Sequence, residues 1–96
     1  MNAHLFVIAK ITPKPAFFES AKKAIENIVP STLKEQGCVS FNLHENQEGE
    51  LFLYEQWVDE AALAAHYEQD YTKAVFSAYE DWLSLPPEIY KMHKVA

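Results

Sequence analysis

The sequence predicts an α+β protein in which an antiparallel sheet carries its helices on one face. Four short segments alternate their apolar residues as strands do, and two longer segments, residues 15–36 and 60–82, repeat them at helical spacing. Along the chain the order is strand, helix, strand, strand, helix pair, strand, which is the split arrangement of a ferredoxin-like sheet. The 96 residues make a single domain, residues 1–96.

The first strand is predicted over residues 4–12, where apolar side chains alternate onto both faces. Pro15 then suits the first turn of a helix. The apolar face of this helix is formed by Phe18, Ala21, Ile25 and Ile28. Pro30 should kink or split the helix, because its ring clashes with the preceding turn, and residues 31–36 would then form one or two further turns. Gly37 stands where a left-handed C-terminal cap belongs.

Strands are also predicted over residues 38–45 and 51–58, joined by a polar hairpin loop over residues 46–50. The strand over residues 51–58 carries apolar side chains on both faces, so neither face is expected to lie in solvent. One face holds Leu51, Leu53, Glu55 and Trp57, and the other holds Phe52, Tyr54, Gln56 and Val58. Helices are available for only one face of such a sheet, so we expect a second copy of the chain to cover the other face in a homodimer.

Asp59 is a good N-cap for a short helix over residues 60–67, and Asp70 is expected to cap the next helix. One face of that next helix holds Tyr71, Val75, Ala78, Tyr79 and Trp82. A pair of prolines ends it. Residues 88–95 are predicted as the last strand.

The composition narrows the class of ligand. The net charge of −6 and the isoelectric point near 5.1 argue against a nucleic-acid surface, which would be basic. All eight basic residues are lysines. Without arginine the chain lacks the side chain that binds phosphates and carboxylates through two parallel hydrogen bonds, so we expect a neutral, largely apolar ligand.

Cys38 is the only cysteine, so no disulfide can form within the chain, and we expect it to pack as a small buried side chain. The apolar stretch of residues 5–9 is too short for a signal peptide or a membrane span, which favours a cytoplasmic protein without a membrane partner. HENQE at residues 44–48 lacks the second histidine of the zinc motif HExxH, and two glycines cannot build a phosphate loop. We therefore expect no metal and no nucleotide cofactor.

Three motifs are recognisable: EQGC at residues 35–38, LYEQW at 53–57 and DEAALAAH at 59–66. In this order, with a hairpin between the first two, they make the chain resemble the antibiotic biosynthesis monooxygenase domain family, close to its small quinol-monooxygenase-like proteins. The similarity extends from the first strand to Tyr79. It implies a dimeric α+β barrel, in which two ferredoxin-like sheets pack face to face and each protomer keeps a ligand cavity between its sheet and its helices.

The resemblance also implies an activity. The family includes oxygenases that use no metal, flavin or haem, so a monooxygenase that acts on a phenol or quinol with molecular oxygen is expected. Haem degradation is disfavoured, because that branch uses an asparagine on the first strand, absent here, and a tryptophan about where His66 stands. An isomerase of a small phosphorylated ketone is weakened by the lack of arginine. A non-catalytic dimer that binds a small ligand in the same cavity remains an alternative.

His66 is the candidate for proton transfer. It shares a helical face with Leu63, so its ring is expected to point toward the sheet. An imidazole can accept a phenolic proton near neutral pH, and the resemblance supports this role because the matching family segment ends in a histidine. The alternative is a structural histidine that bonds the last carbonyls of its own helix.

Glu55 is the second candidate for a catalytic role. It stands between Leu53 and Trp57 on an apolar face, where a carboxylate must be paired, hydrogen-bonded or protonated. Both a structural hydrogen bond and a proton-handling role fit this position. On the preceding strand Asn42 and His44 share one face, so we expect them to reach the cavity or the dimer interface as substrate-binding groups.

Aromatic residues are abundant enough to line a site for a planar ring. The walls are expected to include Tyr54, Trp57, Tyr67 and Trp82. Helical or strand spacing also explains each of these residues as part of the core. The two readings differ in whether the ring edges face a cavity or other side chains.

Overall fold

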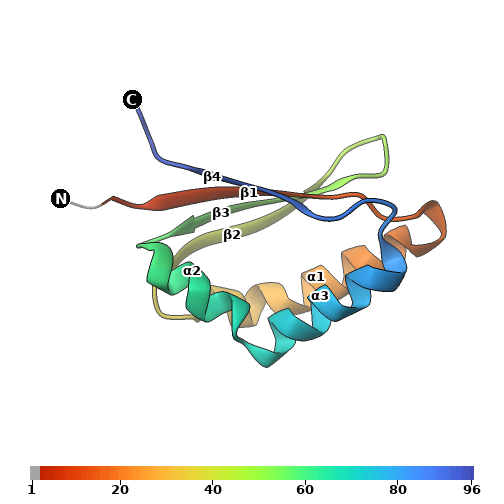
Figure 1. Cartoon of the computed structure of the whole chain (residues 1–96), viewed down its shortest axis with the longest axis horizontal. Coiled ribbons are helices and arrows are strands. Elements are labelled where there is room, and N and C mark those ends of the chain that lie inside the picture. The colour runs from red at the N-terminus through yellow and green to blue at the C-terminus, as the bar shows by residue number, and fades with distance from the viewer. Residues whose placement is uncertain (1–2) are drawn as a thin grey trace.

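The computed structural model describes residues 3–96, in which three α-helices lie against one face of a four-stranded antiparallel sheet (Figure 1). The strands are β1 (Leu5–Ile11), β2 (Cys38–Glu45), β3 (Leu51–Trp57) and β4 (Glu88–Met92), paired in the order β2-β3-β1-β4. The helices are α1 (Phe18–Leu33), α2 (Glu60–Tyr67) and α3 (Asp70–Trp82), with a short 3-10 helix, η1 (Pro15–Phe17), before α1. The predicted ferredoxin-like α+β fold is confirmed.

α1 continues past Pro30 to Leu33, so of the expected kink or split the split is wrong. Pro30 lies in the last turn, where few helical hydrogen bonds remain to be lost. It deprives the carbonyl of Glu26 of its usual N–H partner. Glu26 and Pro30 are both exposed, so water can bond to that carbonyl and the helix tolerates the proline.

Gly37 has a φ of +90°, the left-handed conformation that the sequence predicts, but it lies beyond the end of α1, in the turn before β2. Its carbonyl accepts a hydrogen bond from the N–H of Val58 at 2.9 Å. A β-carbon at this position would lie 2.6 Å from the Cβ of Ala62 on α2. Glycine is therefore needed for the backbone conformation and also because the turn packs directly on α2.

The ends of the later elements follow the prediction in part. Asp59 caps α2 as expected, because its Oδ1 accepts a hydrogen bond from the N–H of Ala62 at 2.8 Å. Asp70 does not cap α3: it is the first helical residue, and the N-cap is Gln69, whose side chain makes no capping bond. β4 ends at Met92 rather than at residue 95, since its partner strand β1 begins only one residue beyond the pairing of Met92.

The core lies between the sheet and the helices. The alternate residues of β1 and β3 that face the helices are buried, and so is Phe41 from β2. They are Leu5, Val7, Ala9 and Ile11 on β1, and Leu51, Leu53, Glu55 and Trp57 on β3. The helices contribute Ala21 and Ile25 from α1, Leu63 from α2, and Val75 and Tyr79 from α3. Glu55 is thus a carboxylate in an otherwise apolar layer.

The opposite face of the sheet is left open by the helices of residues 3–96, as expected (Figure 1). Its centre carries apolar and aromatic side chains, namely Phe6, Ile8, Phe52 and Tyr54. Tyr54 is 42% exposed. None of the helices that residues 3–96 form has both the length and the apolar character that a membrane crossing requires.

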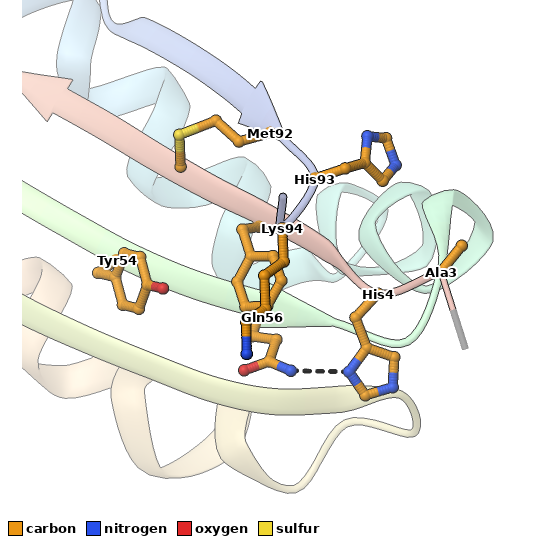
Figure 2. Close-up of a pocket in the computed structure, with 8 residues that line it drawn as sticks. Ala3, His4, Tyr54, Gln56, Met92, His93 and Lys94 are labelled. Carbon is orange, nitrogen blue, oxygen red and sulfur yellow. Dashed lines mark hydrogen bonds between the residues drawn. The ribbon is translucent and has the colours of Figure 1, made fainter. Parts of the chain in front are cut away.

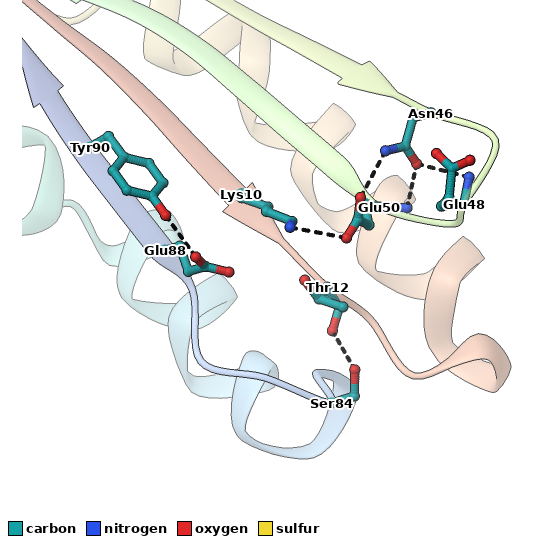
Figure 3. Close-up of polar contacts among 8 residues, drawn as sticks. All are labelled: Lys10, Thr12, Asn46, Glu48, Glu50, Ser84, Glu88 and Tyr90. Carbon is teal, nitrogen blue, oxygen red and sulfur yellow. Dashed lines mark hydrogen bonds and ion pairs between the residues drawn. The ribbon is translucent and has the colours of Figure 1, made fainter.

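Polar contacts fasten the loops at the hairpin end of the sheet (Figure 3). Asn46 Oδ1 accepts a hydrogen bond from the N–H of Glu50 at 3.0 Å, which closes the loop between β2 and β3. Glu50 also pairs with Lys10 of β1 at 3.2 Å. The hydroxyl of Ser84 donates to the carbonyl of Thr12 at 3.1 Å. These contacts hold the ends of the strands without bringing charge into the core.

Candidate functional site

His66 is buried near the C-terminal end of α2, with its side chain only 4% exposed. Its ring points toward the sheet, as expected from the helical spacing. The imidazole centroid lies 4.9 Å from the ring of Trp57, 5.4 Å from that of Phe41 and 5.7 Å from that of Tyr67. The imidazole is therefore enclosed by aromatic side chains from β2, β3 and its own helix.

The polar partner of His66 is Glu35, a residue that the sequence reasoning did not identify as part of a site. His66 Nδ1 lies 2.9 Å from Glu35 Oε2, and the Glu35 side chain is 7% exposed. The hydroxyl of Tyr71, in the first turn of α3, donates to the same oxygen. The turn before β2 and the neighbouring ends of α2 and α3 thus meet at one carboxylate oxygen. We call Glu35, His66 and Tyr71 the buried polar cluster.

The ring of His66 bonds to Glu35 and not to the last carbonyls of α2. The alternative prediction, that this histidine bonds the carbonyls of its own helix, is therefore wrong. Glu35 carried little signal in the sequence, because it lies in a turn without hydrophobic periodicity. It does fall within the EQGC motif, two residues before Gly37, which has a positive φ. Tyr71 was predicted only as part of an apolar helix face.

Glu55 lies in the middle of β3 and is 4% exposed. One of its oxygens, Oε1, accepts a hydrogen bond from Trp57 Nε1 at 2.9 Å. Burial raises the pKa of Glu55 to about 7, the Trp57 hydrogen bond opposes this rise, and the negative charge of Glu35 adds to it. Glu55 can therefore gain or lose a proton near neutral pH, and its structural hydrogen bond does not prevent this.

Burial also raises the pKa values of two tyrosines near His66. It raises the pKa of Tyr67 to about 12, and burial together with the hydrogen bond to Glu35 raises the pKa of Tyr71 to about 12. Both hydroxyls therefore stay protonated at neutral pH. Tyr71 remains a hydrogen-bond donor to Glu35 throughout that range.

A small cavity of about 20 Å³ lies between the sheet and the helices, with Glu55, His66 and Tyr67 in its wall. Apolar and aromatic side chains complete the lining, among them Ile25, Phe41, Leu53, Val75 and Tyr79. This volume holds about one water molecule, so a planar ring does not fit the cavity in this closed form. Two buried atoms in this region of residues 3–96, Glu35 Oε1 and Thr72 Oγ1, have no hydrogen-bond partner.

A surface pocket of about 340 Å³ lies beside the cavity, between α3 and the segment that leads into β4. The two spaces share Phe76, Tyr79 and Pro87 in their walls. Phe76 is 37% exposed, and its ring centroid lies 5.2 Å from that of Tyr79 and 5.8 Å from that of Tyr67. Aromatic side chains of α3 therefore stand between the internal cavity and the solvent.

The predicted aromatic walls are placed in three different environments. Trp57 packs on His66 and Tyr67 lines the cavity, so these two lie with the candidate base. Trp82 is half-buried against the core but does not line the cavity. Tyr54 lies on the opposite, open face of the sheet, so the expectation that it shares a cavity with His66 is wrong. The reason is the period of two along β3, which puts Tyr54 and Glu55 on opposite faces.

Asn42 and His44 also lie on the open face, where they are exposed, and Asn42 pairs across the ladder with Tyr54. They therefore do not reach the internal cavity. The other predicted location, the dimer interface, stays a prediction. A groove of about 830 Å³ lies on the same face and is lined by Tyr54, Gln56, Met92, His93 and others. Figure 2 shows these side chains. Within it His4 Nδ1 lies 2.7 Å from Gln56 Nε2.

Comparison with known proteins gives a consistent result. A family model described as antibiotic biosynthesis monooxygenase matches residues 4–78. The "Putative monooxygenase Rv0793" of Mycobacterium tuberculosis is 31% identical over 67 residues, which are 69% of this chain and 66% of that protein. The chain thus matches just under two thirds of the length of that curated relative.

Solved structures extend the match to the whole chain. The structure of Rv0793 from Mycobacterium tuberculosis has a TM-score of 0.92 at 23% identity and covers 98% of this chain and 97% of that one, a likeness of fold alone. The crystal structure of PA3566 from Pseudomonas aeruginosa has a TM-score of 0.92 at 26% identity, with 100% and 98% covered. A conserved protein from Methanosarcina mazei Go1 has a TM-score of 0.89 at 27% identity, with 97% and 94% covered.

Proposed function

Because the chain belongs to the antibiotic biosynthesis monooxygenase family, we propose that it is a monooxygenase acting on a phenolic or quinol-type aromatic substrate without metal, flavin or haem. One observation carries the proposal. A buried imidazole and a carboxyl group with a pKa of about 7 line the same apolar, aromatic cavity. Proton-accepting groups in a dry aromatic site suit the deprotonation of a phenol.

In this proposal His66 accepts the phenolic proton and Glu55 supports the transfer. The anion that results is the electron-rich form of the substrate, which gives an electron directly to molecular oxygen. The protein then has three tasks: to orient the ring, to take up the proton and to exclude water from the reactive anion. Trp57 and Tyr67 are suited to the first and third tasks, because they flank His66 with large apolar surfaces.

A substrate ring requires the cavity to widen. The neighbouring surface pocket of about 340 Å³ supports a route of entry, because Phe76 and Tyr79 line both spaces. Rotation of these side chains would join the two volumes without a change in the sheet. Rotation of exposed side chains is among the fastest motions of a protein, and Phe76 is 37% exposed, so a closed resting cavity is compatible with turnover.

We further propose that two chains form a homodimer through the open faces of their sheets. This face carries Phe6, Ile8, Phe52 and Tyr54, which the helices within residues 3–96 do not cover. A stable interface of standard size would bury about 1,600 Å² in total. Asn42 and His44 would then lie within or at the rim of that interface.

Aerobic oxidation of menadiol tests the activity. The wild-type protein should consume oxygen faster than menadiol does spontaneously, and the added rate should vanish in the His66→Gln variant. The same assay after chelation and dialysis should give an unchanged rate if no metal takes part. A wild-type rate equal to the spontaneous rate would contradict the proposed enzymatic activity. If an apolar ring still bound under those conditions, the chain would be a non-catalytic ligand-binding protein.

A further inference from the structure

We propose that Glu35 is a positioning residue: in the neutral form of His66 it holds the ring proton on Nδ1, so that the Nε2 lone pair is free for substrate. This inference rests on the proposed function for its purpose, since a base must present an unprotonated nitrogen. The position of the ring proton can be measured in the protein without substrate. It therefore has a test that does not depend on turnover.

The hydrogen bonds around Glu35 define where the proton sits. Glu35 Oε2 is 2.9 Å from His66 Nδ1 and also accepts from the hydroxyl of Tyr71. Convergence of two contacts on one oxygen fits an ionised carboxylate, which is an acceptor only. A neutral imidazole has a single N–H, so a bond to a carboxylate requires that N–H to be at Nδ1.

The other ring nitrogen is thereby left as an acceptor. The hydrogen bond that the His66 ring makes within residues 3–96 uses Nδ1, with Glu35 as the partner, so Nε2 is the nitrogen left for a ligand. The His66 side chain contributes to the wall of the internal cavity. A phenol bound there would meet an imidazole whose free lone pair is ready to accept a proton. When that proton arrives, the new positive charge lies beside the carboxylate of Glu35, which stabilises it.

The backbone around Glu35 is built to keep this distance constant. Glu35 lies in the turn after α1, and the next residues of this turn are held by the bond from Val58 N–H to the carbonyl of Gly37. Gly37 approaches Ala62 so closely that a β-carbon would lie 2.6 Å from the Ala62 Cβ. Ala62 and His66 are one turn apart on α2. The segment that supplies the carboxylate is thus packed on the helix that supplies the imidazole.

Three substitutions separate positioning from simple packing. Glu35→Gln keeps a carbonyl oxygen that can accept from Nδ1–H but removes the charge. Glu35→Leu removes the acceptor and leaves Nδ1 without a partner. Tyr71→Phe removes the second donor to Glu35 and leaves the bond to His66 in place, so it serves as the matched control.

The readout is the ¹⁵N NMR spectrum of His66 at a pH where the ring is neutral, together with menadiol turnover. We expect wild type, Glu35→Gln and Tyr71→Phe to carry the proton on Nδ1, and Glu35→Leu to shift it to Nε2, the site that unpaired imidazole prefers. Turnover should fall about 10²-fold in Glu35→Leu, as for loss of a general base, and clearly less in Glu35→Gln.

The outcomes that overturn the inference are distinct from those that overturn the activity. A wild-type His66 protonated on Nε2 would refute it outright, and so would an unchanged spectrum in a folded Glu35→Leu variant. Should Glu35→Leu fail to fold, the wild-type spectrum still decides the question. A wild-type protein that carries the His66 proton on Nδ1 but shows no turnover would support the positioning of His66 and refute the proposed monooxygenase activity.

Discussion

The two faces of β3 carry similar side chains in very different environments. Glu55 and Trp57 face the helices and are 4% and 0% exposed, whereas Tyr54, between them and the hairpin, points to the open face and is 42% exposed. On the covered face, burial raises the pKa of Glu55 to about 7 and aromatic rings enclose His66. On the open face, a broad groove remains in contact with solvent. Aromatic composition alone therefore does not say which face holds a reactive site, because desolvation by the helices is what changes the chemistry.

The largest effect should come from a core residue of the covered face. Phe41→Ala removes a side chain that is 1% exposed and should lower the free energy of unfolding by about 3–5 kcal/mol. Phe52→Ala, on the open face of the neighbouring strand, should cost clearly less at a concentration where the chain is monomeric. Urea unfolding at that concentration measures both values. Equal losses would mean that the faces are not differently packed in one chain.

The next effect concerns pH. Because the pKa of Glu55 is raised on folding, the native state binds its proton more tightly than the unfolded state does, and the resulting stability is present below about pH 4.5 and lost as pH rises through about 7. The loss should be on the order of 2–3 kcal/mol. Glu55→Gln should remove this part of the pH dependence. Urea unfolding of both proteins at pH 4.5 and pH 8 measures this loss. An identical change in the free energy of unfolding between the two pH values in wild type and Glu55→Gln would contradict a buried, titrating Glu55.

Two histidines on opposite faces test where the chemistry occurs. His66→Gln retains a side chain able to donate to Glu35 but cannot act as a base near neutral pH, so menadiol turnover should fall by about 10²-fold or more. His44→Gln, on the open face, should leave turnover within about twofold. Melting temperatures of both variants provide the control for folding. Similar turnover of wild type and a folded His66→Gln variant would remove His66 from the site.

The smallest expected effect is on assembly. Tyr54→Lys places a charge at the centre of the open face and should weaken the dimer at least about tenfold, whereas Phe17→Lys, at an exposed position on η1, should not. Light scattering across a dilution series measures the mass relative to the 11.0 kDa of one chain. A wild-type protein that stays at that mass at micromolar concentration would refute the homodimer.

Local patterns were sufficient to predict the elements of the fold. Strand alternation, helical spacing and the cap at Asp59 each act over a few residues, so the sequence contains the information needed. Pro30 misled the prediction because the cost of a proline depends on how close it lies to the end of a helix and on whether water reaches the freed carbonyl. Asp70 misled it because a good capping residue one position inside a helix no longer has the backbone geometry of a cap.

The site was predicted less completely than the fold. His66 and Glu55 were identifiable, since polar residues on apolar faces stand out. Glu35 was not, because its role depends on a turn packing against a helix that follows it by more than twenty residues. The position of Tyr54 could have been derived from the period of two along its strand. The size of the cavity could not, because it depends on how the side chains of α3 close over the sheet.

β3 also connects the two surfaces mechanically. Tyr54 and Glu55 are adjacent, so a single peptide unit separates the face expected to meet a second chain from the wall of the internal cavity. Any displacement of the strand by a partner would be felt by the carboxyl group that titrates near neutral pH. Ligand binding and dimerisation would then be thermodynamically linked, and each would strengthen or weaken the other by the same factor. Ligand affinity would consequently vary with protein concentration, which titrations at a single concentration would miss.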